Sequence, residues 1–418
     1  MATFATIFLT ILTLGLLIET GLAQRHIRHI RRHRNTVPPA FTGHIDIAEH
    51  QRAADYTITN TVFGILELFY NTTILLVFTL GGGLDYIDQT VSAWALDPLV
   101  HGVIFILLTL ALFSLAEIPL ALYETFVIES RFGFNRTTLN LFILDHFKEA
   151  ILLILIGAPL AAAILWFMLH SGEWWWLFAW SAWCVFVFFM MWAFPAFIAP
   201  LFNRFTPLAN DTVQQRIDAL LERCGFKHYR VYVMDGSRRS NHGNAYFTGV
   251  GANKRIVFYD TLLKSLSPEE IEAVLAHELG HFKLKHITKR LWWTVGMSFG
   301  ALALLGWLSV QSWFYSGLGV HQASPHAALM LFMLCLPLVS RLIRPLMTFT
   351  ARKHEFEADD FASQHSDPQH LIDALVKLYG ENANTLTPDP WYSAYHDTHP
   401  PAPIRVANLA TKMSPAAG

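Results

Sequence analysis

Cysteine and charged residues are both scarce in this 418-residue chain. Its three cysteines, Cys184, Cys224 and Cys335, lie far apart and form no C-x-x-C pair, which argues against a disulfide framework and against a zinc site built from thiolates. Asp, Glu, Lys and Arg make up only 15% of the residues, and the formal net charge is −2. The sequence therefore lacks the excess of basic residues that nucleic-acid binding needs, and we expect no nucleic-acid partner.

Apolar residues are correspondingly abundant. Hydrophobic residues reach 53% of the chain and charged residues only 15%. In an ordinary soluble domain, charged residues account for about 25%. A helix crosses a bilayer with about 20 largely apolar residues. The composition, together with several apolar runs of at least this length, predicts an all-α polytopic membrane protein that is embedded in a lipid bilayer. We expect about seven transmembrane helices, at residues 2–22, 59–83, 99–126, 149–170, 174–202, 291–316 and 326–349.

The distribution of Arg and Lys predicts the orientation in the membrane. Five arginines lie within residues 25–34, whereas the predicted loops 84–98, 171–173 and 317–325 contain neither Lys nor Arg. Because basic loops stay in the cytosol, the alternation places the N-terminus outside and both residues 203–290 and the C-terminal tail inside. The first apolar run carries its positive charge after the run, so we interpret it as a retained anchor rather than a cleaved signal peptide.

The strongest functional pattern is an H-E-x-x-H motif formed by His277, Glu278 and His281. Residues four apart share one face of a helix, so the two imidazoles can reach one Zn²⁺ while Glu278 stands beside it as a general base. Upstream, Ser267 and Glu270 have the spacing of a capping box, with Pro268 at the first helical position. The motif is therefore predicted to lie on a well-defined helix, as zinc chemistry requires.

A catalytic zinc usually takes a third protein ligand, and residues 352–360 offer several donors on one predicted helix. Glu355 and Asp359 are four apart, which suits a carboxylate ligand and a second carboxylate that orients a ligating histidine. His354 and Glu357 compete for the ligand role. A solvated acidic helix end is the alternative, and spacing alone does not decide between them.

Residues 203–290 are predicted to form a small cytosolic α+β unit that carries the motif. Asp211 is expected to cap a helix, and strands are expected at 229–234, 244–248 and 255–259. An extended peptide can add to the open edge of a strand, and the segment at 244–248 is our candidate. The alternative is that these residues only complete a small sheet.

Several further stretches have a distinctive sequence: Tyr123–Phe126, Glu129–Asn135, Asn244–Phe247, Lys254–Val257, Asp260–Leu263, Glu355–Asp359 and His399–Pro401. Through them, most of the chain resembles the integral-membrane zinc CAAX prenyl proteases, the type I CAAX endopeptidases of eukaryotes and their bacterial relatives. The C-terminal residues Ser-Pro-Ala-Ala-Gly form neither a CAAX box nor an ER-retrieval signal, which favours a bacterial member.

The resemblance implies a role for each residue of a zinc site. It implies that His277, His281 and Glu355 bind one Zn²⁺ per chain, that Glu278 is the catalytic base, and that Asp359 orients a ligand. It also implies that seven helices enclose a water-filled chamber with the zinc site at its cytosolic end.

Substrate contacts follow from the same resemblance. His399 and Arg405 match positions that meet the substrate and stabilise the developing oxyanion, with His399 a catalytic residue. Asn244, Ala245 and Tyr246 are expected to contact the substrate.

The resulting hypothesis is a membrane-embedded zinc metalloendopeptidase that cleaves prenylated C-terminal or other membrane-associated peptides. A quality-control protease for membrane proteins is an alternative within proteases, and a transporter or scaffold with a non-catalytic metal site is an alternative outside them. We expect the inner membrane if the source is bacterial and the endoplasmic reticulum if it is eukaryotic, with the active site facing the cytosol. The expected divisions of the chain are 1–202, 203–290, 291–349 and 350–418.

Overall fold

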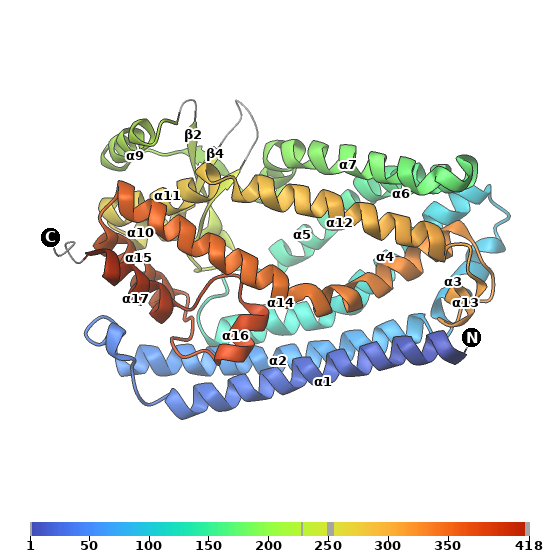
Figure 1. Cartoon of the computed structure of the whole chain (residues 1–418), viewed down its shortest axis with the longest axis horizontal. Helices are drawn as coiled ribbons and strands as arrows, with labels where there is room; N and C mark the ends of the chain where they lie inside the picture. Colours follow the sequence, from blue (N-terminus) through green and yellow to red (C-terminus); the bar gives the residue numbers. More distant parts are fainter. Residues whose placement is uncertain (1, 227–228, 249–254, 414–418) are drawn as a thin grey trace.

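The computed structural model describes residues 2–226, 229–248 and 255–413. Within these residues, seven helical segments are long and apolar enough to cross a membrane, as the sequence predicts. They run along the long axis of the molecule, and the start of α1 lies at the opposite end of that axis from the helices near the end of the described chain (Figure 1). The seven segments are α1 (Ala2–His33), α2 (Ile47–Phe78), α4 with η2 (Pro98–Tyr123, Glu124–Glu129), α5 with η3 and α6 (Leu139–Leu152, Leu153–Gly157, Ala158–His170), α7 with η5 and α8 (Trp175–Ala193, Phe194–Ile198, Ala199–Phe202), α12 (His286–Leu308) and α14 (Pro325–His365).

The first helix is longer than its apolar run. We expected the span to end at residue 22 with a basic loop after it, but α1 continues as a helix to His33. The cause is contact with the C-terminal part of the chain. Arg25 pairs with Asp389 at 2.8 Å, and the His26 ring stacks on Tyr392 at 3.9 Å between centroids. Four of the five arginines expected in a loop, all except Arg34, therefore lie on the last turns of α1.

The sixth and seventh helices also differ from their expected limits. Helix α12 begins at His286 and ends at Leu308, and a separate short helix, α13 (Ser312–Ser316), follows it where we expected one continuous span. Helix α14 does not end with its apolar residues but continues unbroken to His365. As the sequence predicted, the donors of residues 352–360 therefore lie on one helix, an extension of the seventh span.

A four-stranded sheet lies at the end of the molecule where α14 leaves the apolar region (Figure 1). Its strand order is β1-β2-β4-β3, with β2 and β4 parallel and the two outer strands antiparallel to them. The three predicted strands are present, and β3 lies at an edge of the sheet. Residues 249–254, which the sequence predicts to be a glycine-rich link between the strands at 244–248 and 255–259, lie outside the described residues. The strands are β1 (Phe205–Pro207), β2 (Arg230–Met234), β3 (Ala245–Thr248) and β4 (Arg255–Tyr259).

Helices pack around this sheet and form a second apolar core. Val213, Ile217 and Leu220 of α9 share one buried face, as the sequence predicts. The helix cap is Asn210 rather than Asp211, because the Asn210 side chain accepts the Val213 N–H. The remaining helices are α3 (Gly83–Ser92), α9 (Asp211–Arg223), α10 (Asp260–Ser265), α11 (Pro268–Lys283), α15 (Pro368–Glu381), α16 (Pro390–His396), α17 (Ala402–Met413) and the short turns η1 (Pro39–Phe41), η4 (Gly172–Trp174) and η6 (Gly236–Arg238).

Candidate active site

The H-E-x-x-H motif lies on α11, whose start is fixed by the predicted capping box. The Ser267 hydroxyl accepts the Glu270 N–H at 3.3 Å, and the Glu270 carboxylate accepts the Ser267 N–H at 2.7 Å. Both reciprocal bonds satisfy N–H groups that the helix leaves free. One turn apart on this helix, His277 and His281 bring their Nε2 atoms to 3.2 Å from each other. Glu278 lies between them in sequence and is half-buried.

Helix α14 supplies the carboxylate that completes the cluster. Glu355 Oε1 lies 3.2 Å from His281 Nε2, and Glu355 Oε2 lies 3.5 Å from His277 Nε2. The two helices approach closely at Gly280. A Cβ there would stand 3.0 Å from the Ala358 Cα, tighter than nearly all real contacts. The glycine of the motif therefore allows α14 to place Glu355 beside both histidines.

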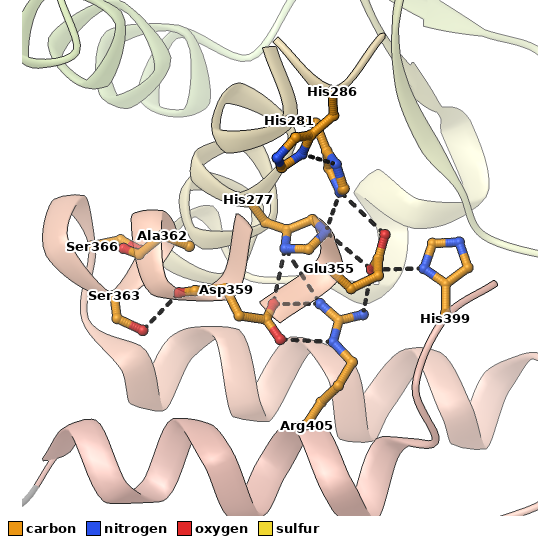
Figure 2. Close-up of polar contacts among 10 residues, drawn as sticks. All are labelled: His277, His281, His286, Glu355, Asp359, Ala362, Ser363, Ser366, His399 and Arg405. Carbon is orange, nitrogen blue, oxygen red and sulfur yellow. Dashed lines mark hydrogen bonds and ion pairs between the residues drawn. The ribbon is translucent and has the colours of Figure 1, made fainter. Parts of the chain in front are cut away.

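Asp359 and Arg405 hold His277 from the opposite side. Asp359 is fully buried and its Oδ1 lies 2.9 Å from His277 Nδ1. The Arg405 guanidinium, from α17, bonds the same carboxylate through Nε at 2.9 Å and Nη2 at 2.5 Å. A carboxylate on Nδ1 fixes a histidine with its Nε2 lone pair free to bind a metal. Figure 2 shows His277, Asp359 and Arg405 close together on one side of Glu355.

Arg405 sits deeper than a residue expected to contact substrate. It is buried, and its Nη1 lies 3.5 Å from Glu355 Oε2. Burial disfavours its charge, but Asp359 and Glu355 outweigh this and raise the pKa of Arg405. In this structure the guanidinium therefore supports two carboxylates of the site, and a direct contact with substrate stays a prediction.

The donors of this cluster fit a divalent metal ion. Burial and the nearby Arg405 disfavour the charged form of His277, but Asp359 and Glu355 outweigh them and raise the pKa of His277 to about 9. Positive charge is thus strongly stabilised at this position. Glu355 Oε2 is buried and accepts no hydrogen bond of good geometry from the described residues. Two imidazoles and a carboxylate match a common donor set of catalytic zinc.

A neighbouring cluster, formed by His286, His354 and Glu357, was not expected as a unit. His286 Nδ1 lies 3.1 Å from His281 Nδ1, and His286 Nε2 lies 2.9 Å from a Glu357 oxygen. His354 stacks on the His286 ring. The two residues that competed with Glu355 in the sequence therefore face a different side of α14. The signal that sequence reasoning missed was His286, five residues beyond the motif.

His399 reaches the site from the tail after α16. Its Nδ1 lies 2.7 Å from Glu355 Oε2, and its side chain is 65% exposed. Figure 2 shows it approaching Glu355 from the side opposite Asp359. His399 also lines a cavity of about 780 Å³, together with residues of α1, α2 and α14. Arg341 and Arg344 of α14 line the same cavity.

The predicted substrate strand, β3, lies at an edge of the sheet, and no described strand pairs with its outer side. Strand β3 pairs on one side with β4 and packs against α11, which carries the motif. Asn244, just before the strand, is exposed, and Ala245 and Tyr246 are half-buried. The Tyr246 hydroxyl contacts the Met234 sulfur at 4.0 Å. The strand is therefore placed where an added peptide would run beside the helix of the motif.

Comparison with known proteins identifies the family. Residues 26–204 match the family described as CAAX prenyl protease N-terminal, five membrane helices, and residues 207–413 match peptidase family M48. The chain belongs to the M48 peptidases that carry a CAAX prenyl protease N-terminal domain. Its fold matches the crystal structure of S. mikatae Ste24p with a TM-score of 0.88 at 31% identity, over 97% of this chain and 98% of that one.

Similar proteins of known name extend over nearly the whole chain. The CAAX prenyl protease 1 homolog of Oryza sativa is 34% identical over 91% of this chain and 92% of its own length. CAAX prenyl protease 1 of Saccharomyces cerevisiae is 32% identical over 89% and 88%. The chain is therefore a multi-pass membrane metalloprotease that acts on a peptide or protein, and the transporter or scaffold alternative is not favoured. Whether its source is bacterial stays a prediction.

Proposed function

We propose that this M48 peptidase is a zinc endopeptidase in which His277, His281 and Glu355 hold one catalytic Zn²⁺. The proposal rests on three ligand side chains, His277 and His281 of α11 and Glu355 of α14, whose ligand atoms lie within 4.8 Å of one another. Glu355 Oε2 is buried and accepts no hydrogen bond of good geometry from the described residues. Asp359 orients His277, and Arg405 holds Asp359 in place. When bound, the zinc supplies a Lewis acid that polarises the scissile carbonyl and lowers the pKa of a water molecule.

The other steps belong to side chains of this chain. Glu278 follows His277 on α11 and is half-buried. It accepts the proton of the attacking water and later donates it to the leaving amine. His399 Nδ1 faces Glu355, and in the imidazolium form, which has a proton on each ring nitrogen, Nε2–H can donate a hydrogen bond to the carbonyl oxygen as negative charge develops. The open edge of β3 holds the peptide through main-chain hydrogen bonds, with contacts from Asn244, Ala245 and Tyr246.

We further propose that the substrate is a membrane-associated peptide of the CAAX type. The relatives are named CAAX prenyl proteases, and the cavity beside His399 is bounded by membrane helices. The cavity is lined by apolar residues such as Ile65 and Leu68 and by charged ones such as Arg341, so the names of the relatives, rather than its lining, suggest a prenyl group. The distribution of basic residues supports placing the site on the cytosolic side. A quality-control protease for membrane proteins is the second candidate, because the same site accepts an unmodified chain.

Cleavage by a Glu278→Gln variant tests the assignment of the base. The purified protein is mixed with a peptide of the CAAX type, and zinc content and cleavage are measured on the same sample. We expect a loss in kcat of about 10²–10⁴-fold with unchanged zinc content, because a general base contributes about this factor. Glu269→Gln is the matched control, since Glu269 lies on the same helix and pairs with Arg216 at the surface. Wild-type turnover in Glu278→Gln would refute the assignment.

Substrate class is tested by comparing a farnesylated peptide with the same unmodified peptide. A preference for the farnesylated form, expressed as a ratio of kcat/KM, supports the CAAX type. Equal rates on both peptides would instead favour the quality-control function.

A further inference from the structure

A second cluster of metal-ligand side chains lies far from the site described above. Asp88 of α3, His101 of α4 and His326 of α14 come together where these helices meet, near α13. Figure 1 shows that α3 and α13 lie at the opposite end of the long axis from α11. The cluster is therefore separated from His277 by the length of the membrane helices.

The three side chains converge on one oxygen atom. Asp88 Oδ1 lies 2.7 Å from His101 Nε2 and 2.8 Å from His326 Nε2. The two imidazole rings stack, with centroids 4.7 Å apart and an angle of 27° between planes. Each side chain is 11–13% exposed, so the cluster is mostly buried but still open to solvent. This arrangement places two histidine nitrogens and a carboxylate oxygen around a single point.

Hydrogen bonds alone satisfy this arrangement poorly. The Oγ of Ser324 lies 2.9 Å from the same Nε2 of His326 that faces Asp88. That oxygen also accepts the Ala327 N–H at the start of α14. One Nε2–H cannot be directed fully at both Asp88 and Ser324. A lone pair on each Nε2, turned toward a shared cation, removes this conflict.

The site of the H-E-x-x-H motif provides an internal comparison. Within the described residues, three groups bring ligand atoms of three His, Cys, Asp or Glu side chains within 4.8 Å of one another. One is His277, His281 and Glu355, and the second adjoins it. The third is the distant cluster. All three groups contain two imidazoles and one carboxylate, but in the second group only His286 contacts the carboxylate, while His354 stacks on the His286 ring. The same crowding of two Nε2 atoms on one carboxylate occurs in the first and third groups.

We propose that Asp88, His101 and His326 form a second Zn²⁺ site at this end of the molecule. Two imidazoles and a carboxylate suit zinc, and three protein ligands leave the fourth position to water. No general base comparable to Glu278 precedes or follows these ligands in sequence. The role of the site is therefore to link α3, α4 and α14, the last of which also carries Glu355. The full protein then holds two zinc ions per chain, one at each end.

Metal content of the purified protein in detergent tests the proposal. The protein is stripped with a chelator, incubated with Zn²⁺, freed of excess metal and analysed for zinc per chain. We expect two in the wild type and one in His101→Ala/His326→Ala. We also expect one in His277→Ala/His281→Ala, which shows that the second ion binds independently of the catalytic site. A count of one in the wild type, or two in His101→Ala/His326→Ala, would overturn the proposal.

Two further variants separate a metal site from a hydrogen-bonded link. Asp88→Asn keeps an oxygen that accepts an imidazole N–H but removes the charge that a cation needs, so zinc content falls to one if the site binds metal. His321→Ala is the matched control. His321 is 80% exposed and pairs with Asp85, which lies on α3 as Asp88 does. Its loss is therefore expected to leave two ions bound.

Thermal melting with and without added Zn²⁺ completes the test. In the variant that lacks His277 and His281, zinc raises the melting temperature if the distant site binds it. This rise disappears on adding Asp88→Asn. A melting temperature that does not respond to zinc, while His101→Ala/His326→Ala still lowers it, identifies a purely hydrogen-bonded link and refutes the metal site.

Discussion

Replacing Asp359 by Asn tests how much Asp359 stabilises the proposed metal ligand His277, because it leaves the proposed ligands themselves unchanged. Asp359 is fully buried and receives one hydrogen bond from His277 and two from Arg405. The amide of Asn has one acceptor oxygen and one NH₂ group, and the NH₂ group meets donors. Because Oδ1 receives both the His277 and the Arg405 Nη2 contacts, an Asn oxygen at that position keeps these two and loses the bond from Arg405 Nε.

The expected cost is large because the partner is also buried. The lost bond to a charged group costs about 1.5–3 kcal/mol. Loss of the negative charge of the carboxylate adds to this, because removing one partner of a buried ion pair costs about 3–5 kcal/mol. Among the described residues, Arg405 keeps Glu355, at 3.5 Å, as its counter-charge. We also expect zinc affinity to fall about 10–100-fold, since a neutral amide orients His277 less firmly than a carboxylate does.

The assay measures thermal melting of the metal-free protein and zinc affinity of the same preparation. Asp360→Asn is the matched control, because it makes the same chemical change one residue further along α14. Asp360 is 44% exposed and pairs with Lys412 at 3.0 Å, an interaction worth about 0–1 kcal/mol. If Asp359→Asn behaves like Asp360→Asn in both measurements, the proposed support of His277 by Asp359 is wrong.

Two further variants test other contacts of the site. His399→Ala is expected to lower kcat about 10²–10³-fold in a peptide-cleavage assay while zinc content stays unchanged, because His399 is exposed and supplies an oxyanion donor; a loss of zinc instead would make it a ligand. Gly280→Ala is expected to lower stability by about 1–3 kcal/mol in thermal melting, because its Cβ would meet the Ala358 backbone at 3.0 Å; Gly296→Ala, where a Cβ meets no atom within 4 Å, is the control and is expected to melt as the wild type does.

Hydropathy predicted the existence of the seven membrane helices but not their ends. The apolar run of the first span stops near residue 22, yet α1 continues to His33 because Arg25 and His26 bind Asp389 and Tyr392, more than 360 residues away. A local window contains no trace of such partners. At α9 the sequence offers two adjacent capping residues, Asn210 and Asp211, and local spacing does not choose between them.

The metal cluster shows the same division between local and distant information. His277 and His281 were predictable because helical geometry fixes residues four apart. The choice of Glu355 over His354 and Glu357 was not, because it depends on which face of α14 meets α11. That face is selected by the close packing of Gly280 on Ala358, a contact between residues nearly eighty positions apart. Family resemblance supplied the answer that spacing left open.

Helix α14 connects the two ends of the molecule. Near its start His326 belongs to the distant Asp88 cluster, and in its last turns Glu355 lies beside His277 and His281 while Asp359 contacts His277. Between them, Arg341 and Arg344 line the cavity that His399 also borders. Two prolines, Pro337 and Pro345, also lie in α14 between the two clusters. A proline inside a helix removes a main-chain hydrogen bond and bends the helix, so α14 is poorly suited to transmit a displacement from one cluster to the other. We therefore expect His101→Ala/His326→Ala to leave the zinc affinity at His277 unchanged, and a large loss of that affinity would show that α14 couples the two sites.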